Sequence, residues 1–259
     1  MPEPLLAIDN VSVSYDGGAT FAVREAKLDL PAGTFVSLVG ASGSGKTSLL
    51  KCINRLSEPT SGEIRFEGQP NHALPAHELR RRIGYVFQGI GLFPHMGVAE
   101  NIAITPKLLR WPDDQVAGRV NELLDLVQLP REMASRPSRA LSGGQQQRVG
   151  IARALAAKPK LMVMDEPFGA LDPVTRDGLG TAYRKLHDAL GLTTIMVTHD
   201  IQEAVLLSDR IVVMEKGRIV AEDTPRAMMR MTDNPGVAAL MAVPRDQFAR
   251  VAKIMDDHV

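Results

Sequence analysis

Apolar and polar residues alternate in two segments near the N-terminus. Val11 and Val13 are separated from each other and from Tyr15 by serines, and residues 26–30 alternate apolar side chains with Lys27 and Asp29. A period of two residues sends successive side chains to opposite faces of an extended strand. We therefore expect two half-buried antiparallel strands at the start of the chain.

Continuous apolar runs recur further along the chain. Residues 35–39 are followed by Gly40, and residues 161–164 form a similar run. Such runs are typical of central strands that are covered on both faces. A further strand is predicted at 193–198, and the segments 211–214 and 218–221, joined by a glycine-containing turn, predict a hairpin.

Helical spacing appears first after residue 48. Leu49, Leu50, Ile53 and Leu56 recur at helical intervals before the breaker segment 57–62. A later helix is expected to carry four regularly spaced apolar side chains and to end at a glycine. Its residues are Leu179, Tyr183, Leu186 and Leu190, followed by Gly191.

In the middle of the chain, apolar residues recur at the spacing of a helix. One apolar face is formed by Val116, Val120, Leu123, Leu124 and Val127, in a helix that opens at Pro112-Asp113-Asp114. We interpret residues 88–153 as a mostly helical subdomain inserted into an α/β core made of residues 1–87 and 154–230. Residues 231–259 form a short C-terminal extension whose helicity the pattern leaves open.

Composition narrows the class of protein. The 259 residues carry 30 basic and 30 acidic side chains, so the formal net charge is zero. No overall electrostatic field therefore attracts nucleic acid or anionic lipid. The single Cys52 excludes an intrachain disulfide and is expected to be a small buried residue. The N-terminus lacks the features of a secretory signal, and no run approaches about 18 apolar residues. We expect a soluble chain that reaches a membrane only through a partner.

A glycine-rich loop follows the apolar run 35–39. Residues 40–47 match G-x-x-x-x-G-K-[ST] between a predicted strand and a predicted helix, so backbone N–H groups can converge on phosphate oxygens. The helix dipole supplies at most about 2 kcal/mol, whereas micromolar ATP binding requires about 8 kcal/mol. Lys46 and a Mg²⁺ ion must therefore contribute, with the Thr47 hydroxyl as a metal ligand. The predicted ATP-binding residues of this loop are Gly40, Ala41, Ser42, Gly43, Ser44, Gly45, Lys46, Thr47 and Ser48.

Two adjacent acids end the apolar run 161–164. Neighbouring strand residues face opposite ways, so Asp165 and Glu166 can take different roles. We expect Asp165 to be the Mg²⁺ partner and Glu166 to be the general base that orients the attacking water. His199 ends another predicted parallel strand, at the edge where active sites gather.

A second anion site is predicted without a lysine. Ser142 is a natural N-cap, and Gly143 and Gly144 expose N–H groups with no side chain in the way. The chain already has a complete phosphate loop for its own ATP. The second site therefore requires a second phosphate or a second chain.

Leu141-Ser142-Gly143-Gly144-Gln145 resembles the signature of the ATP-binding cassette proteins. Six motifs occur in the order found in that family, across about residues 6–224: Tyr15, the phosphate loop, Gln88, the signature, Asp165-Glu166 and His199. The resemblance implies a P-loop NTPase core, with a mixed sheet flanked by helices, an N-terminal antiparallel β-subdomain and an inserted α-helical subdomain.

The same resemblance implies roles for individual residues. Tyr15 would stack on adenine, although the residue itself fits a packed strand aromatic equally well. Gln88 would sense Mg²⁺ and the attacking water, and His199 would contact the γ-phosphate. Asp172 would reach the partner subunit from the loop 169–172, while also fitting a helix start. In a head-to-tail homodimer, Ser142, Gly143, Gly144 and Gln145 would close over the ATP held by the other copy.

More specifically, the segments 88–96, 100–102 and 108–111 look like those of ATPase subunits of bacterial importers for quaternary ammonium osmoprotectants such as glycine betaine, choline and carnitine. This resemblance implies a peripheral subunit on the cytoplasmic face of the inner membrane, beneath two transmembrane permease subunits and fed by an extracytoplasmic solute-binding protein. An importer ATPase for an amino acid or another small solute is the alternative. A non-transport cassette acting on nucleic acid is disfavoured by the single neutral cassette.

Two features depart from the osmoprotectant pattern. Many of these ATPases continue into a tandem nucleotide-sensing regulatory module, and from the end of the sequence at Val259 we expect no such module here. The family often has a tyrosine-proline pair before the signature, where this chain has Arg136-Pro137. That change either alters coupling to the permease or leaves a solvated arginine, and we favour the second interpretation.

Overall fold

The computed structural model describes residues 3–89 and 91–256, and its first sheet is antiparallel. The strand order is β2-β1-β4-β5, with β1 (Leu6–Val13) paired to both β2 (Val23–Leu30) and β4 (Ser61–Phe66). The short β5 (Gln69–Pro70) completes the sheet. The two predicted N-terminal strands are confirmed, but β1 ends at Val13, so Tyr15 lies outside it.

The second sheet is mixed and has the strand order β10-β9-β3-β8-β7-β6. All neighbours pair in parallel except β9 and β10, which form the predicted hairpin. The carboxyl ends of β3, β7 and β8 therefore meet at one edge. The strands are β3 (Phe35–Val39), β6 (Ile83–Val86), β7 (Leu161–Asp165), β8 (Thr193–Val197), β9 (Arg210–Glu215) and β10 (Arg218–Asp223).

The central strands bury both faces, as their continuous apolar runs predicted. Val36 and Leu38 join a core with α1 (Lys46–Ile53) and the antiparallel sheet, whereas Phe35 belongs to a core with the helices of the opposite face. Cys52 is buried in α1, and burial raises the pKa of its thiol to about 11. The structure thus leaves this thiol protonated and structural.

One helical expectation is wrong at its end. Leu56 lies outside α1 and is 42% exposed, because the helix ends at Ile53 and Arg55 adopts a left-handed backbone with φ of 50°. A left-handed residue cannot continue a right-handed helix. The later helix is confirmed, because α6 (Pro173–Leu190) ends before the left-handed Gly191 as predicted, and its last residue Leu190 is 52% exposed.

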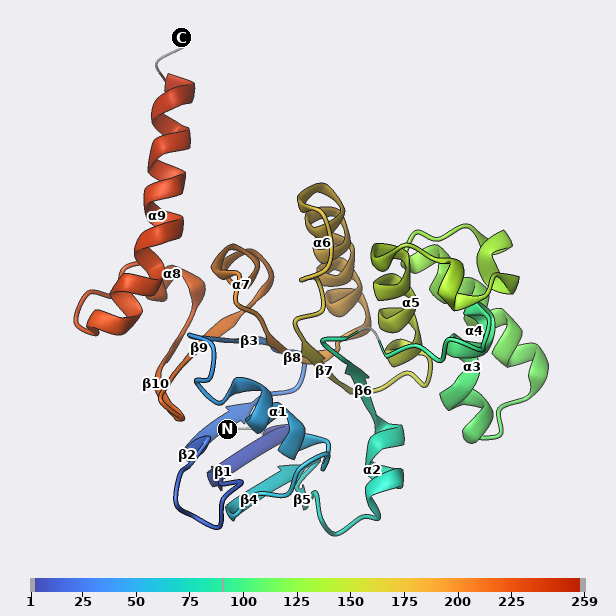
Figure 1. The fold of residues 1–259 in the computed structure, drawn as a ribbon, viewed down its shortest axis with the longest axis horizontal. Coiled ribbons are helices and arrows are strands. Elements are labelled where there is room, and N and C mark those ends of the chain that lie inside the picture. Colours follow the sequence, from blue (N-terminus) through green and yellow to red (C-terminus); the bar gives the residue numbers. More distant parts are fainter. Residues whose placement is uncertain (1–2, 90, 257–259) are drawn as a thin grey trace.

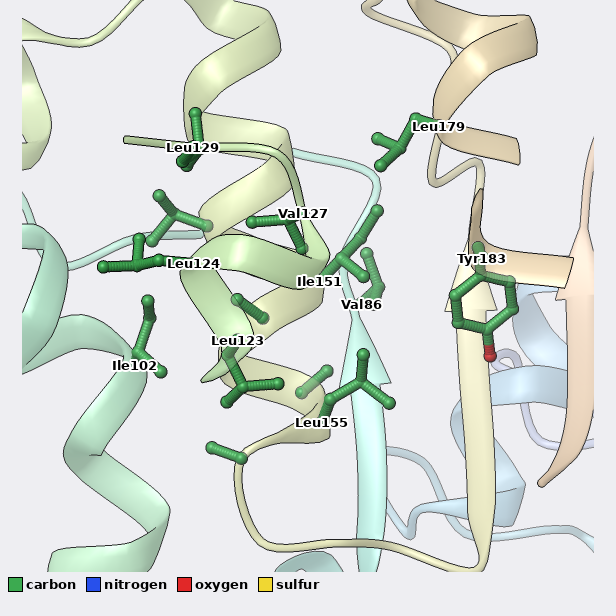
Figure 2. Close-up of a cluster of buried hydrophobic side chains, with 14 of the residues drawn as sticks. Val86, Ile102, Leu123, Leu124, Val127, Leu129, Ile151, Leu155, Leu179 and Tyr183 are labelled. Carbon is green, nitrogen blue, oxygen red and sulfur yellow. The ribbon is translucent and has the colours of Figure 1, made fainter. Parts of the chain in front are cut away.

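Helices fill the segment between β6 and β7, preceded by α2 (Ala76–Arg82) (Figure 1). Figure 2 shows Leu123 and Leu124 of α4, and Val127 just beyond its end, in one cluster with Ile151 and Leu155 of α5. The same cluster includes residues of β6 and α6, so the helices between β6 and β7 pack against the sheet. These helices are α3 (Val98–Leu108), α4 (Asp113–Leu126), α5 (Gly143–Leu155) and the short 3-10 helices Arg131–Ser135 and Ser138–Ala140.

The C-terminal part continues with α7 (Ile201–Leu207), α8 (Pro225–Met228) and α9 (Pro235–Asp256). Val237 and Met241 of α9 are buried against Met228, while Phe248 is 47% exposed where the helix extends away from the body (Figure 1). The extension whose helicity the sequence left open is thus helical from Pro235 to Asp256, and residues 257–259 lie outside the described part. No helix within the described residues is long and apolar enough to cross a membrane.

Candidate functional site

The phosphate loop joins β3 to α1, as the sequence predicted. Gly40 has φ of 144° and Gly45 has φ of 101°, and a Cβ at either position would come within 2.2 Å of a backbone oxygen, Met214 O or Ala22 O. Only glycine fits both positions. No side chain caps the start of α1 and its first turn carries no acidic residue. The first N–H groups of the helix therefore face the loop with partial positive charge, ready for an anion.

Lys46 is held inside this loop. Its Nζ donates to Gly40 O at 2.8 Å, to Ala41 O at 2.9 Å and to Ser44 Oγ at 3.3 Å. Burial lowers the pKa of Lys46, while the carboxylates of Glu166 and Asp165 act in the opposite direction. The ammonium group thus lies where negative charge stabilises it, between the loop and the acids that end β7.

Thr47 and Asp165 meet across the sheet edge. The Thr47 hydroxyl donates to Asp165 Oδ1 at 3.1 Å, joining the start of α1 to the last residue of β7. Asp165 is almost fully buried, and burial raises the pKa of its carboxyl group, although the Thr47 hydrogen bond lowers it. The Thr47 hydroxyl oxygen and the buried carboxylate of Asp165 therefore lie next to each other beside Lys46.

Glu166 turns the chain at the end of β7. Its φ of 48° is in the left-handed region, and its N–H donates to Val197 O at 2.9 Å, at the end of β8. A non-glycine residue in this conformation costs about 1–2 kcal/mol and persists where the surroundings fix it. The turn carries the Glu166 side chain out of the strand direction that Asp165 follows.

Gln88 and His199 converge on one oxygen of Glu166. Gln88 Nε2 donates to Glu166 Oε2 at 3.0 Å, and His199 Nδ1 lies 3.5 Å from the same oxygen. Gln88 follows β6 and His199 follows β8. Two residues that the sequence selected from separate segments thus approach one carboxylate oxygen of the third selected residue, Glu166.

Tyr15 lies in the loop after β1, with 65% of its surface exposed. This exposure contradicts the alternative of an aromatic packed in the core. The ring is open to an external partner, and its stacking on adenine stays a prediction.

The signature segment forms the N-terminus of α5. Ser142 Oγ accepts from Gln145 N at 3.3 Å, and Gln145 Oε1 accepts from Ser142 N at 3.1 Å. This reciprocal pair is a capping box and confirms Ser142 as the N-cap. A Cβ built on Gly143 meets no heavy atom within 4 Å, whereas one on Gly144 would lie 3.1 Å from Leu171 Cδ2. The start of α5 is open on the Gly143 side and is backed by Leu171.

Asp172 begins α6. It accepts a hydrogen bond from Thr175 N at 3.0 Å, and Pro173 is the first residue of the helix, as predicted. Hydrogen bonds from Thr175 lower the pKa of the Asp172 carboxyl group. Arg176, one turn further along, was not predicted from the sequence, and its guanidinium group donates to Leu171 O and Asp200 Oδ2. No periodicity or motif marks this arginine, because its partner Asp200 lies at the start of another helix, α7.

The comparison with known families agrees with this geometry. The family model described as ABC transporter matches residues 23–169. The chain belongs to the ABC transporter family. This confirms the resemblance seen in the signature, and the mixed sheet with an antiparallel N-terminal sheet is the fold expected from it.

Two curated relatives are osmoprotectant proteins by name. The choline transport ATP-binding protein OpuBA of Bacillus subtilis (strain 168) is 50% identical over 226 residues, which cover 87% of this chain and 59% of that protein. The glycine betaine uptake system ATP-binding protein YehX of Escherichia coli (strain K12) is 50% identical over 217 residues, covering 84% of this chain and 70% of that protein. The chain thus spans less than two thirds of the length of OpuBA.

A solved structure has the same architecture. The dimeric post-hydrolysis state of the ATP-binding cassette MJ0796, bound to ADP and phosphate, superposes with a TM-score of 0.78 at 35% identity, covering 85% of this chain and 99% of that chain. That neighbour is a dimer, and it holds hydrolysis products.

Proposed function

We propose that this chain is a Mg²⁺-dependent ATPase subunit that energises a bacterial ABC importer. The observation that carries the proposal is the convergence of Gln88 and His199 on Glu166, beside a complete phosphate loop. A carboxylate in that position is placed to orient water against the terminal phosphate.

Binding of ATP rests on the loop and the first turn of α1. The backbone N–H groups of residues 40–48 and the Lys46 ammonium group stabilise phosphate negative charge, while Tyr15 supplies an exposed ring for the base. Phosphate oxygens would replace the loop carbonyls as acceptors for Lys46. The loop therefore holds its cation ready for the ligand.

The residues present fit Mg²⁺. Thr47 and Asp165 offer two neighbouring oxygens, which suits an ion that takes few protein ligands and otherwise binds water and phosphate. The amide oxygen of Gln88 is the expected third ligand. The bound ion would neutralise charge on the phosphate oxygens. Asp165, whose pKa is raised by burial, gains a counter-charge when the site fills.

In ATP hydrolysis, Glu166 would act on the attacking water. Its Oε2 accepts the proton of the attacking water, while Gln88 and His199 fix the direction of the carboxylate. His199, which is 66% exposed, would also reach the γ-phosphate. The general base and its two orienting partners thus come from the ends of three parallel strands.

Completion of the site requires a second copy of the chain. The N-terminus of α5 presents Ser142, Gly143, Gly144 and Gln145 as an open anion site, and the dimeric state of the solved cassette supports a homodimer. The two copies would face each other head to tail. Asp172 would lie at the contact between the two copies. Each signature would close over the ATP bound by its partner.

The cargo we propose is a quaternary ammonium osmoprotectant such as glycine betaine or choline, from the names of the two curated relatives. The chain would then lie on the cytoplasmic face of the inner membrane, beneath two permease subunits, with a solute-binding protein on the other side. Residues 88–153 would transmit closure of the dimer to the permease. Ile90, which belongs to this predicted interface, lies outside the described residues.

Substitution of Glu166 by glutamine tests the proposed chemistry. Glutamine keeps the size of the side chain but accepts no proton, so we expect kcat for ATP hydrolysis to fall by about 10² to 10⁴-fold with ATP binding retained. Steady-state phosphate release and titration with a fluorescent ATP analogue measure the two quantities. Glu132→Gln, at an exposed position, is the matched control and should hydrolyse like the wild type. Undiminished turnover in the Glu166 variant would remove this residue as the base.

The cargo is tested separately. Genes for a binding protein and a permease would first be sought beside the gene for this chain. The solute that the purified binding protein retains would then be identified by calorimetry with choline, glycine betaine and an amino acid. We expect a quaternary ammonium compound to bind and to stimulate ATPase activity in the reconstituted complex. Retention of an amino acid alone would assign the importer to the other solute class.

A further inference from the structure

Arg176 lies between two loops of the proposed active site. Its Nη1 donates to Asp200 Oδ2 at 3.0 Å and its Nη2 donates to Leu171 O at 3.1 Å. Its Nε lies 3.6 Å from Glu203 Oε1. One guanidinium group therefore contacts the loop before α6 and the start of α7 together.

The acidic partners of Arg176 hold the residues on both sides of His199. Asp200 follows His199 directly, and Glu203 Oε2 accepts from the Thr198 hydroxyl at 2.7 Å. The same hydroxyl accepts from Asp200 N at 3.0 Å. Thr198 and Asp200 are thus fixed by a closed set of hydrogen bonds, so the backbone that carries His199 is oriented by groups bound to Arg176.

The other partner of Arg176 leads to the signature. Leu171 presents its carbonyl oxygen to Arg176 and its side chain to Gly144, where a Cβ on the glycine would lie 3.1 Å from Leu171 Cδ2. Asp172, the next residue, caps α6 through Thr175 N. The start of α5 therefore rests on a residue whose backbone Arg176 holds in place.

The charges in this network are partly shielded from solvent. The Arg176 side chain is 28% exposed, that of Asp200 26% and that of Glu203 10%. Ion pairs at such positions are screened less than surface pairs, and the loss of one partner leaves a desolvated charge behind. A planar guanidinium group can donate to a carbonyl oxygen and to carboxylates in different directions at once, whereas an ammonium group on the shorter lysine chain cannot match that geometry.

We propose that Arg176 is a positioning residue that couples the two half-sites carried by one chain. On one side Arg176 contacts the loop of His199, which would act on the ATP bound by the same chain. On the other side it contacts Leu171, which supports the signature, and the signature would act on the ATP bound by the partner. The inference rests on the proposed function, because it assigns these two half-sites to two different nucleotides. A shift of the signature on dimer closure would thereby reach His199 through Leu171 and Arg176.

The test compares Arg176→Ala and Arg176→Lys with the wild type. We expect kcat for ATP hydrolysis to fall by about 10- to 100-fold in both variants, the size of effect that a 1 Å misplacement of a catalytic group produces. ATP affinity and KM should stay unchanged, because neither loop belongs to the phosphate loop or the adenine contact. Lysine keeps the positive charge and should preserve thermal stability, so it reports on the link even if the alanine variant folds poorly.

Arg184→Ala is the matched control. Arg184 lies two turns further along α6 and pairs with Asp188 and Asp209, and its Nη1 donates to Leu207 O at the far end of α7. Its loss weakens the same pair of helices without touching the His199 loop. We expect this variant to keep its kcat. An equal fall of kcat in the Arg184 variant, or full activity in the Arg176→Lys variant, would overturn the proposal.

Hydrogen exchange of the nucleotide-free protein separates this inference from the proposed function, because it does not depend on hydrolysis. In the Arg176 variants, peptides covering 169–172 and 198–203 should both exchange faster than in the wild type, and in the Arg184 variant neither should. Faster exchange in only one of the two segments contradicts the link. A wild-type protein without ATPase activity would refute the proposed function and leave this structural result standing.

Discussion

Asp165 and Glu166 are neighbours in the chain but have different environments. Asp165 continues the β7 strand, is buried and bonds to Thr47, whereas Glu166 leaves the strand with a left-handed backbone and meets Gln88 and His199. The alternation of strand residues predicted that the two acids would separate. The left-handed turn adds a direction that alternation alone does not give, and it brings the carboxylate to the ends of β6 and β8.

At this residue scale, Asp165→Asn should stabilise the nucleotide-free protein. Burial raises the pKa of the Asp165 carboxyl group, so ionisation is unfavourable in the empty site, and asparagine removes that charge while still accepting from Thr47. In a chain of this size, each relief of about 1 kcal/mol corresponds to a Tm increase of about 2–4 °C. Scanning calorimetry should show the increase without nucleotide, together with loss of the extra stabilisation that Mg²⁺ and ATP give the wild type.

The pH dependence of this difference follows from the sign of the shift. A carboxyl group whose pKa is raised by folding costs nothing below its ordinary pKa of 3.8, where both states are protonated. The cost appears as the pH rises through the folded-state pKa. The Tm advantage of the asparagine variant should therefore be absent in acid and be fully developed at neutral pH. An advantage that is constant with pH would assign it to packing.

At the scale of the element, α5 is anchored at both of its ends. Ser142 and Gln145 cap its N-terminus, and at its C-terminal end the buried Arg119 of α4 donates to Leu155 O and Ala156 O. In return, Arg148 of α5 donates to Val127 O beyond the end of α4. The two helices thus satisfy each other's terminal carbonyl groups, which holds the signature at a fixed place on the subdomain.

Ser142→Ala separates the structural role of this cap from its role toward phosphate. Loss of the cap should lower stability by about 0.5–2 kcal/mol. We expect ATP binding by the monomer to be unaffected and hydrolysis to be abolished, because the hydroxyl would face the partner's nucleotide. Denaturant melts, analogue titration and phosphate release measure the three effects.

Thr224→Ala is the control for that variant. Thr224 Oγ1 accepts from Ala227 N at 3.3 Å and caps α8, so it resembles the Ser142 cap on a helix that belongs to another core. A similar loss of stability with full ATPase activity is expected there. If Ser142→Ala instead weakened ATP binding by the monomer, the assignment of the signature to the partner's nucleotide would be wrong.

At the scale of the whole molecule, the proposed site is complete only between two copies. Two inactive chains, both carrying Glu166→Gln to prevent hydrolysis, test this arrangement. The first chain also carries Lys46→Ala, so its signature is intact but its phosphate loop is not. The second chain also carries Ser142→Ala, so its phosphate loop is intact but its signature is not. Mixed together, they rebuild one complete site in each mixed dimer.

We expect an ATP-dependent dimer on size exclusion when the two chains are mixed, and far less of it with either chain alone. The nucleotide retained in the dimer should be bound by the chain with the intact Lys46. Equal dimerisation of the Ser142→Ala chain by itself would mean that the signature contributes nothing to closure.

Local sequence by itself determined the elements and the motifs. Val116 to Val127, the apolar runs at 35–39 and 161–164, the glycines of the phosphate loop, the Ser142 cap and the Asp172 helix start were all predicted and are found, because each depends on neighbours within a few residues. The exposure of Leu56 was not predicted, since a single left-handed residue at Arg55 decided it. The family assignment also rested on local motifs, and it is confirmed.

Tertiary structure alone decided which of these motifs meet. The convergence of Gln88 and His199 on Glu166 depends on the strand order β8-β7-β6, which no single segment encodes. Arg176 is the clearest case, because its partners Leu171, Asp200 and Glu203 are brought together by the packing of α6 against α7. Short-range patterns fix backbone conformation, whereas contacts between distant charges form only when the packed sheet and helices bring them within hydrogen-bond distance.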